Sequence, residues 1–391
     1  MTDIYFDNSA TTQVSDRAAR VALQAMTENY GNPSSVHSRG VAAFHALNEA
    51  RTAFAGYFDG AADEIYFTSC GTESDNIVVQ GAARSGGKRG RIIVSAIEHP
   101  AVYETAKSLQ ALGYQAEFIP VGHDGIIDLD AFASMLDAEV TLVSIMHVNN
   151  ETGAIQPLRE AGKIIRSKVP QALFHVDAVQ SFGRLPMDVA GWQADAVSIS
   201  GHKIHAPKGI GLLWLRKERN IPALIIGGGQ EHGFRSGTEN MSGIMAFAAA
   251  ADDCYSAMHE HYEQMRQIKE TLWQGIKSRV PEAVINGPMD ENAVGYILNV
   301  SFPGIRSEIM LHSLEAKGIC VSAGSACTSG SSKGSRILTS MHLDPAYVDS
   351  AIRFSFSRFN TSAEAEEAVR IIGETMDELA LVKKLGKKSR R

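Results

Sequence analysis

The chain has 391 residues, 44% of them hydrophobic, which is enough to bury a large core and usually means two domains. Charged residues make up 21%, and the formal net charge of -7 provides no basic field for nucleic acid or anionic lipid, so we expect a small or neutral partner. No run of about 18 uncharged apolar residues occurs, and the four cysteines form no CxxC pair. We therefore expect a cytoplasmic protein with reduced thiols, no membrane span and no direct nucleic-acid binding.

Short apolar runs alternate with helical patterns between residues 60 and 216, which is typical of a doubly wound, mostly parallel α/β sheet. Amphipathic stretches such as residues 41–58 and 158–168 are expected to be helices that cover its faces. The predicted strands are residues 64–68, 91–96, 116–121, 141–148, 173–176, 196–200 and 211–215.

The pattern changes after a long helical stretch at residues 241–280, which suits a segment that leaves one domain for another. The elements expected beyond it are strands at residues 296–302, 318–322 and 352–357 and helices at 307–317 and 362–384. We predict a large sheet domain at residues 15–255 and a smaller α+β domain formed by residues 1–14 and 256–391.

Ligands of open parallel sheets bind outside the carboxyl ends of the strands, and the unusual polar residues of this chain follow those ends. Residues 69–74 (Ser-Cys-Gly-Thr-Glu-Ser) come directly after a strand and open a helix. Gly71 allows close approach of the backbone, and free N–H groups with the Thr72 hydroxyl can hold a phosphate. An ordinary helix cap is the alternative for these residues taken alone.

A lysine follows another strand, in Ser200, Gly201, His202 and Lys203, with a turn at residues 206–209 behind it. A lysine held in this way can act as a carbonyl-reactive amine, and the neighbouring serine and histidine can donate to a phosphate. The alternative is a surface lysine in a loop.

Three further side chains follow strands in the same sheet. Asp177 is expected to be partly buried, and a protonated pyridine nitrogen would be a suitable partner for its carboxylate, as pyridoxal enzymes require. His99 can stack on an aromatic cofactor, and Asn150 can hydrogen-bond to its ring or to the substrate. Capping and turn roles are the alternatives, but together these residues favour a pyridoxal-phosphate site.

One thiol stands out in the C-terminal part of the chain. Cys327 lies in a loop rich in glycine and serine at residues 322–332 and is predicted to be presented for reaction, whereas Cys320 reads as a buried strand residue. His259 and His261 are two apart on a helix, and no HExxH motif occurs, so we predict no catalytic metal.

With these residues identified, the chain resembles the cysteine desulfurases, the NifS/IscS-like members of the class V aminotransferases, which have the aspartate-aminotransferase fold (fold type I). The resemblance extends from Tyr5 to about Leu379. It rests on the motifs at residues 5–12, 31–35, 67–76, 201–203, 235–240 and 324–329.

The resemblance implies a role for each site residue. Lys203 would hold pyridoxal 5'-phosphate as a Schiff base. Asp177 would pair with the pyridine nitrogen, Gln180 with the ring hydroxyl, and His99 would stack on the ring as a third catalytic residue beside Lys203 and Cys327. Asn150 and Arg353 would bind the substrate carboxylate. The phosphate would be held by Gly71, Thr72, Ser200 and His202, with Thr238 reaching it from the neighbouring subunit of a homodimer.

The resemblance further implies that L-cysteine is converted to L-alanine, with sulfur passed to Cys327 as a persulfide and then to an acceptor or iron–sulfur scaffold protein. It also allows Cys327 to ligate an iron–sulfur cluster transiently during transfer. One departure follows the reactive loop, where residues 332–336 (Ser-Lys-Gly-Ser-Arg) replace a Leu-Glu-Pro-Ser-like turn. Selenocysteine lyase and another class V aminotransferase are alternative enzymes, and an inactive scaffolding subunit is the alternative of a different class.

Overall fold

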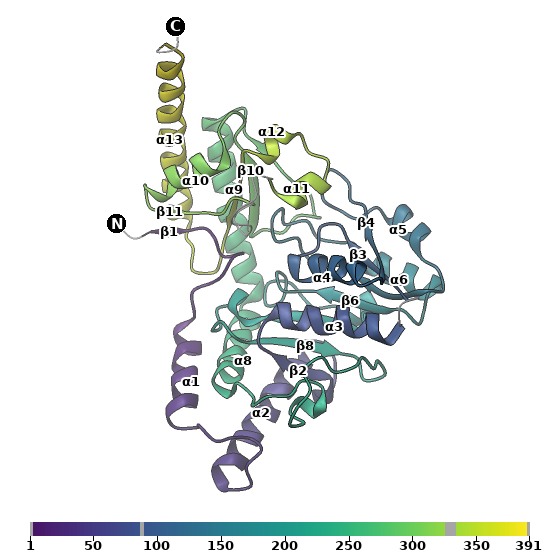
Figure 1. The fold of residues 1–391 in the computed structure, drawn as a ribbon. Helices are drawn as coiled ribbons and strands as arrows, with labels where there is room; N and C mark the ends of the chain where they lie inside the picture. The colour runs from purple at the N-terminus through teal and green to yellow at the C-terminus, as the bar shows by residue number, and fades with distance from the viewer. Residues whose placement is uncertain (1–2, 87–89, 325–333, 389–391) are drawn as a thin grey trace.

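The central feature of the computed structural model, which describes residues 3–86, 90–324 and 334–388, is a seven-stranded sheet ordered β2-β8-β7-β6-β5-β3-β4 (Figure 1). Strand β8 is antiparallel to β2 and β7, and the other neighbours are parallel, which confirms the mostly parallel sheet. The strands are β2 (Ile65–Thr68), β3 (Arg91–Ser95), β4 (Gln115–Ile119), β5 (Val140–Ser144), β6 (Leu173–Asp177), β7 (Ala196–Ser200) and β8 (Gly211–Leu215).

Both faces of this sheet are buried. Along β8, Leu212 and Trp214 pack into one hydrophobic cluster and Leu213 and Leu215 into another, because successive side chains of a strand point to opposite faces. Figure 1 shows two adjacent helices over one face, α3 (Gly71–Gly86) and α4 (Pro100–Ala111). The helices of the other face are α2 (Ser38–Gly56), α6 (Leu158–Lys168), α7 (Val189–Trp192) and α8 (Met241–Ser256).

The N-terminus packs with the C-terminal part of the chain. β1 (Ile4–Tyr5) pairs in parallel with β11 (Ile319–Cys320), and Ile4 and Phe6 belong to a separate hydrophobic cluster. That cluster surrounds an antiparallel sheet in which β10 (Ile297–Ser301) lies between β9 (Val284–Ile285) and β12 (Ala351–Ser355). The helices that complete it are α9 (Met258–Arg279), α10 (Ser307–Glu315) and α13 (Ser362–Lys388).

The division at residues 14/15 and 255/256 stays a proposal. The helix expected over residues 241–280 is interrupted at Ala257, whose φ of -135° and ψ of 30° are not helical, so α8 and α9 are separate. Helix α11 (Arg336–Ser340) departs from a simple division, because Ile337 and Leu338 pack into the cluster of the large sheet. The other helices are α1 (Asp16–Thr27), α5 (Leu129–Met135) and α12 (Pro345–Val348).

Two expectations about strands need correction. The strand expected at residues 141–148 ends at Ser144, because regular pairing with β6 stops there. One hydrogen bond to β6 persists beyond this point, from His147 N to Asp177 O. Cys320 does lie in a strand, but it is only partly buried, because β11 is two residues long and pairs with β1 alone. Among the residues that the structure describes, no helix is long and apolar enough to cross a membrane.

A buried ion pair anchors α2 to the loop that precedes α8. Arg51 Nη1 lies 2.8 Å from Glu231 Oε2, both side chains are buried, and the same carboxylate oxygen accepts a 3.0 Å hydrogen bond from Phe67 N. Removing one member of such a pair leaves an uncompensated buried charge. This pair therefore fixes the loop at residues 231–240 to the edge of the sheet.

We predict that Arg51→Ala destabilises the protein by about 3 to 5 kcal/mol, measured by denaturant unfolding. Lys217→Ala is the control, because it removes an ion pair with Asp63 whose two side chains are both exposed, and it should barely move the midpoint. Equal midpoints for the two variants would contradict the importance of the buried pair.

Candidate functional site at the carboxyl edge of the sheet

The predicted site residues lie where five parallel strands end. Strand β2 leads to Gly71, β7 to Lys203, β6 ends at Asp177, β5 leads to Asn150, and β3 leads to His99. Because these strands share one direction, their following loops meet along one edge of the sheet. The strand order brings together side chains that are far apart in the sequence.

The proposed phosphate cradle lies between β2 and β7. Helix α3 begins at Gly71, and a Cβ atom at this glycine would lie 2.7 Å from Val179 Cγ2 and 3.4 Å from Ser200 Cβ. Ser200 Oγ is buried and, among the described residues, has no hydrogen-bond partner. An unsatisfied hydroxyl beside the free N–H groups of a helix N-terminus fits an anion such as phosphate. Thr72, in the first turn of α3, is exposed.

The buried carboxylate of Asp177 suits the pyridine end of the cofactor. Its Oδ1 accepts a 2.9 Å hydrogen bond from Val179 N, and burial raises the pKa of this carboxyl to about 6, although the backbone bond and the Lys203 charge oppose the rise. A cation placed against Asp177 would favour its ionised form. Gln180 is also buried and donates from Nε2 to Ser9 O at 3.0 Å.

Lys203 projects toward the N-terminal segment. Its Nζ donates to Ser9 O at 2.5 Å and to Ala10 O at 2.8 Å. Burial, with the positive charges of Arg353 and Arg184, lowers the pKa of Lys203 to about 7. A substantial fraction of the amine is therefore unprotonated near neutral pH, as attack on an aldehyde requires.

Two imidazoles accompany this amine. His99 caps α4, accepting a 3.1 Å hydrogen bond from Ala101 N at Nδ1, so the neutral ring carries its proton on Nε2. His202 Nδ1 lies 3.2 Å from Thr11 Oγ1. Burial and the Lys203 charge lower the pKa of both rings to about 4, so both are neutral at pH 7.

The two predicted carboxylate-binding residues meet beside Lys203. Arg353 Nη1 donates to Asn150 O at 3.0 Å, while Nη2 pairs with Asp7 Oδ1 at 2.8 Å. Among the described residues, Arg353 Nε and Asn150 Oδ1 are buried without partners. Unused donor and acceptor atoms in one place indicate room for a polar ligand group.

The remaining predicted residues are not part of this constellation. The Thr238 side chain is exposed on the loop before α8, and its hydroxyl has no hydrogen-bond partner within the described part of the chain. Cys327 lies outside the described residues. The roles of all these residues stay proposals.

Sequence reasoning missed the contribution of the N-terminal segment and of two buried acids. The motif at residues 5–12 could have indicated the N-terminal segment, because it is one of the motifs that the chain shares with the cysteine desulfurases. No role was predicted for Asp7 or Ser9 within it. Glu98 accepts from Met146 N at 2.6 Å, and Asp75 lies 3.6 Å from His175 Nε2. Burial raises the pKa of both carboxyls well above the usual range.

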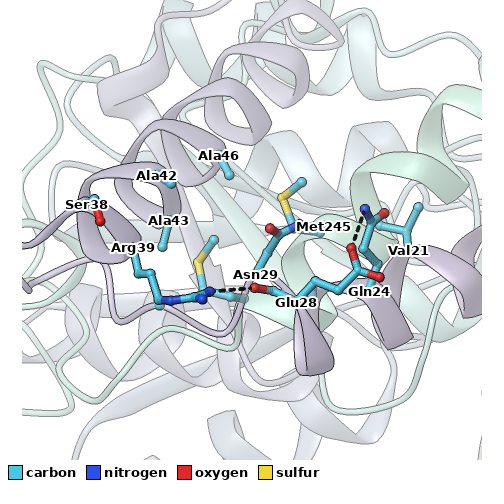
Figure 2. Close-up of a pocket in the computed structure, with 13 residues that line it drawn as sticks. Val21, Gln24, Glu28, Asn29, Ser38, Arg39, Ala42, Ala43, Ala46 and Met245 are labelled. Carbon is cyan, nitrogen blue, oxygen red and sulfur yellow. Dashed lines mark hydrogen bonds between the residues drawn. The ribbon is translucent and has the colours of Figure 1, made fainter.

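A hollow of about 330 Å³ lies elsewhere, between α1, α2 and α8, and contains none of the predicted site residues (Figure 2). Its wall is largely apolar, with Ala42, Ala46 and Met245 facing the opening between the helices. Arg39 donates to Glu28 O at its rim at 3.2 Å. None of the residues proposed to bind the cofactor or the substrate lines this hollow, so it is separate from the site at the edge of the sheet.

The chain is similar to known proteins over nearly its whole length. A family profile described as Aminotransferase class-V matches residues 4–367. A protein of Trichormus azollae named cysteine desulfurase is 38% identical over 379 residues, covering 97% of this chain and 94% of the relative.

Two solved structures share the fold. One, a NifS-like protein, has a TM-score of 0.91 and 36% identity and covers 96% of this chain and all of the other. The second, SspA in complex with cysteine, has a TM-score of 0.80 and 30% identity and covers 92% of this chain and all of the other. The chain therefore belongs to the class-V aminotransferases, a family of pyridoxal-phosphate enzymes, and has their fold type I architecture.

Proposed function

We propose that this enzyme is a cysteine desulfurase that converts L-cysteine to L-alanine and transfers the sulfur to Cys327. The observation that carries the proposal is the position of the Lys203 amine, whose pKa of about 7 reflects burial and the charge of nearby Arg353. The Lys203 amine can thus react with an aldehyde. The nearby guanidinium of Arg353 is suited to binding a substrate carboxylate. The relatives named cysteine desulfurase and the related structure with bound cysteine support this substrate.

The residues present fit pyridoxal phosphate, which supplies an electron sink when bound. We assign its phosphate to Gly71, Thr72, Ser200 and His202, and its ring to Asp177, Gln180 and His99. The neutral His99 ring adds no charge where it stacks, and burial at Asp177 excludes water from its carboxylate. Arg353 and Asn150 orient the substrate carboxylate, which leaves Lys203 Nζ to take and return the proton of the substrate Cα.

The sulfur step needs only a thiolate and a leaving group. Cys327 attacks the substrate sulfur, the S–S bond forms as the carbon–sulfur bond breaks, and a proton completes alanine. L-cysteine and the protein thiol thus give L-alanine and a protein persulfide, so atoms and electrons balance without an external oxidant. A sulfur-acceptor or iron–sulfur scaffold protein in the cytoplasm then receives the sulfur.

The described residues on either side of the reactive loop approach Glu151, the neighbour of Asn150 in the sequence. A side chain at Gly324 would approach Glu151 Oε2 to 2.6 Å and Ser335 Cβ to 3.0 Å, and Ser335 Oγ donates to the same carboxylate at 2.5 Å. Glu151 directly follows Asn150.

A homodimer is the second part of the proposal. Large apolar side chains are exposed on α1, on α2 and in the segment between them, the elements that also form walls of the hollow in Figure 2, and Thr238 lies on the loop that leads into its α8 wall. Apolar surface gathered in this way is typical of a protein interface. We propose that a second copy covers it and contributes Thr238 to the partner's phosphate site. These exposed apolar residues are Leu23, Met26, Tyr30, Val36, Val41 and Phe44.

Lys203→Ala should abolish covalent attachment of the cofactor, because the reactive amine is removed. Borohydride reduction followed by peptide mass spectrometry measures this directly. The wild-type peptide containing Lys203 should carry the cofactor. A cofactor fixed to any residue of the variant would refute the assignment.

Cys327→Ser should still bind the cofactor and L-cysteine but produce neither alanine nor persulfide, because only the sulfur acceptor is lost. Cys320→Ser is the matched control, and its partly exposed position predicts near-native turnover. Alanine release by Cys327→Ser at the wild-type rate would rule out the desulfurase mechanism. Keto-acid-dependent amino transfer in its place would favour an aminotransferase.

Mixed dimers of a Lys203→Ala chain and a Thr238→Ala chain should contain one competent site, because Lys203 of the second chain then meets Thr238 of the first. Cofactor affinity is measured by titrating the apoprotein and comparing it with each parent dimer. If Thr238 serves its own chain, the mixture contains no competent site and affinity does not recover.

A further inference from the structure

Arg184 is a buried cation beneath the proposed active site. Its side chain is only slightly exposed, and its Nη2 donates to the main-chain oxygen of Lys203 at 2.8 Å. Its Nη1 lies 3.4 Å from both Gln180 O and Gln180 Oε1. The guanidinium thus contacts two segments that the proposed function assigns to the cofactor.

The charge of Arg184 is not balanced by an acid. No carboxylate lies within ion-pair distance of it in the described part of the chain. The guanidinium carbon instead lies 4.9 Å from the centre of the Tyr296 ring, a cation–π geometry, and burial lowers the pKa of Arg184. Burying an arginine without an acidic partner costs folding free energy. A role is therefore expected for its charge or for its hydrogen bonds.

The contacts of Arg184 join three elements. Gln180 follows β6, Lys203 ends the turn after β7, and Tyr296 immediately precedes β10 in the hydrophobic cluster of the C-terminal part of the chain. The Tyr296 hydroxyl also donates to Gln180 O at 2.9 Å, which closes a small network. The same residues therefore connect the segments that follow β6 and β7 with the hydrophobic cluster that contains Tyr296.

We propose that Arg184 is a positioning residue for Lys203, holding its main chain and the Gln180 amide in register against Tyr296. This inference rests on the proposed function, because it concerns the lysine assigned to the cofactor. Arg184 touches neither substrate nor cofactor in this account and acts through Lys203 and Gln180.

The electrostatic effect has a definite sign. A positive charge near Lys203 disfavours its protonated form, so the Arg184 charge lowers the pKa of this amine, as does that of Arg353. Asp177 and Asp7 act in the opposite direction. The other titratable or charged groups that face Lys203 or Arg184 are His99, His202, His205, Cys254, His261, Tyr296 and Arg358.

The test compares Arg184→Gln, Arg184→Met and Arg216→Met in the holoenzyme. Glutamine retains a donor for Lys203 O without the charge, and methionine removes both. Arg216 is a matched control because it lies 5.5 Å from the Trp214 ring after β8, at the opposite end of the sheet. The readouts are the dissociation constant of the cofactor and the pH midpoint of its visible absorbance, which reports protonation of the Lys203 nitrogen in its cofactor-bound form, where the same charge argument applies.

Arg184→Gln and Arg184→Met should each raise the absorbance midpoint by roughly one pH unit, and only the methionine variant should also weaken cofactor binding by about tenfold. Arg216→Met should match the wild type. A midpoint unchanged in Arg184→Gln would overturn the inference, and this variant decides the question if the methionine variant fails to fold.

Failure of the inference and failure of the proposed function give different results. If borohydride fixes the cofactor to Lys203 but the Arg184 midpoints are unchanged, only the role of Arg184 is wrong. If the cofactor is fixed to another residue, the assignment of Lys203 is wrong whatever the Arg184 variants show.

Discussion

Burial of ionisable groups at the carboxyl edge of the parallel sheet is the constraint on which the site depends. Asp177 and Lys203 are placed there by consecutive strands of the sheet, β6 and β7. Burial raises the pKa of the acid to about 6 and lowers that of the amine to about 7, so each is displaced toward its neutral form. A cationic ring nitrogen would pair with the Asp177 carboxylate, and an aldehyde would react with the Lys203 amine. A rigid sheet is needed to hold these two side chains apart.

The same burial organises the surrounding residues. Arg353 is held by Asp7 and the Asn150 carbonyl, so its guanidinium keeps a fixed orientation beside the Lys203 amine. Asp7 belongs to the N-terminal segment, whose Ser9 carbonyl also accepts from Lys203. The segment therefore completes a site built mostly from the large sheet.

The sequence predicted the elements that depend on local pattern better than those that depend on distant contacts. The alternation of apolar runs and amphipathic helices identified the sheet, and the polar residues after β2, β3, β5, β6 and β7 identified its edge. No local pattern could show that Asp7 pairs with Arg353, because these residues are 346 apart in the chain and meet only in the folded state. The burial of Cys320 was overestimated because apolar neighbours in the sequence do not reveal that β11 is a short strand with one partner.

We propose that the buried Asp177 carboxylate receives a cation from the cofactor. The decisive measurement is the dissociation constant of pyridoxal phosphate for Asp177→Asn apoprotein, compared with Asp177→Glu and wild type. Binding should be at least about tenfold weaker for the asparagine variant, because a buried charge pair is broken while the shape is kept, and the glutamate variant should lose less. Equal affinity of the asparagine variant and the wild type would contradict it.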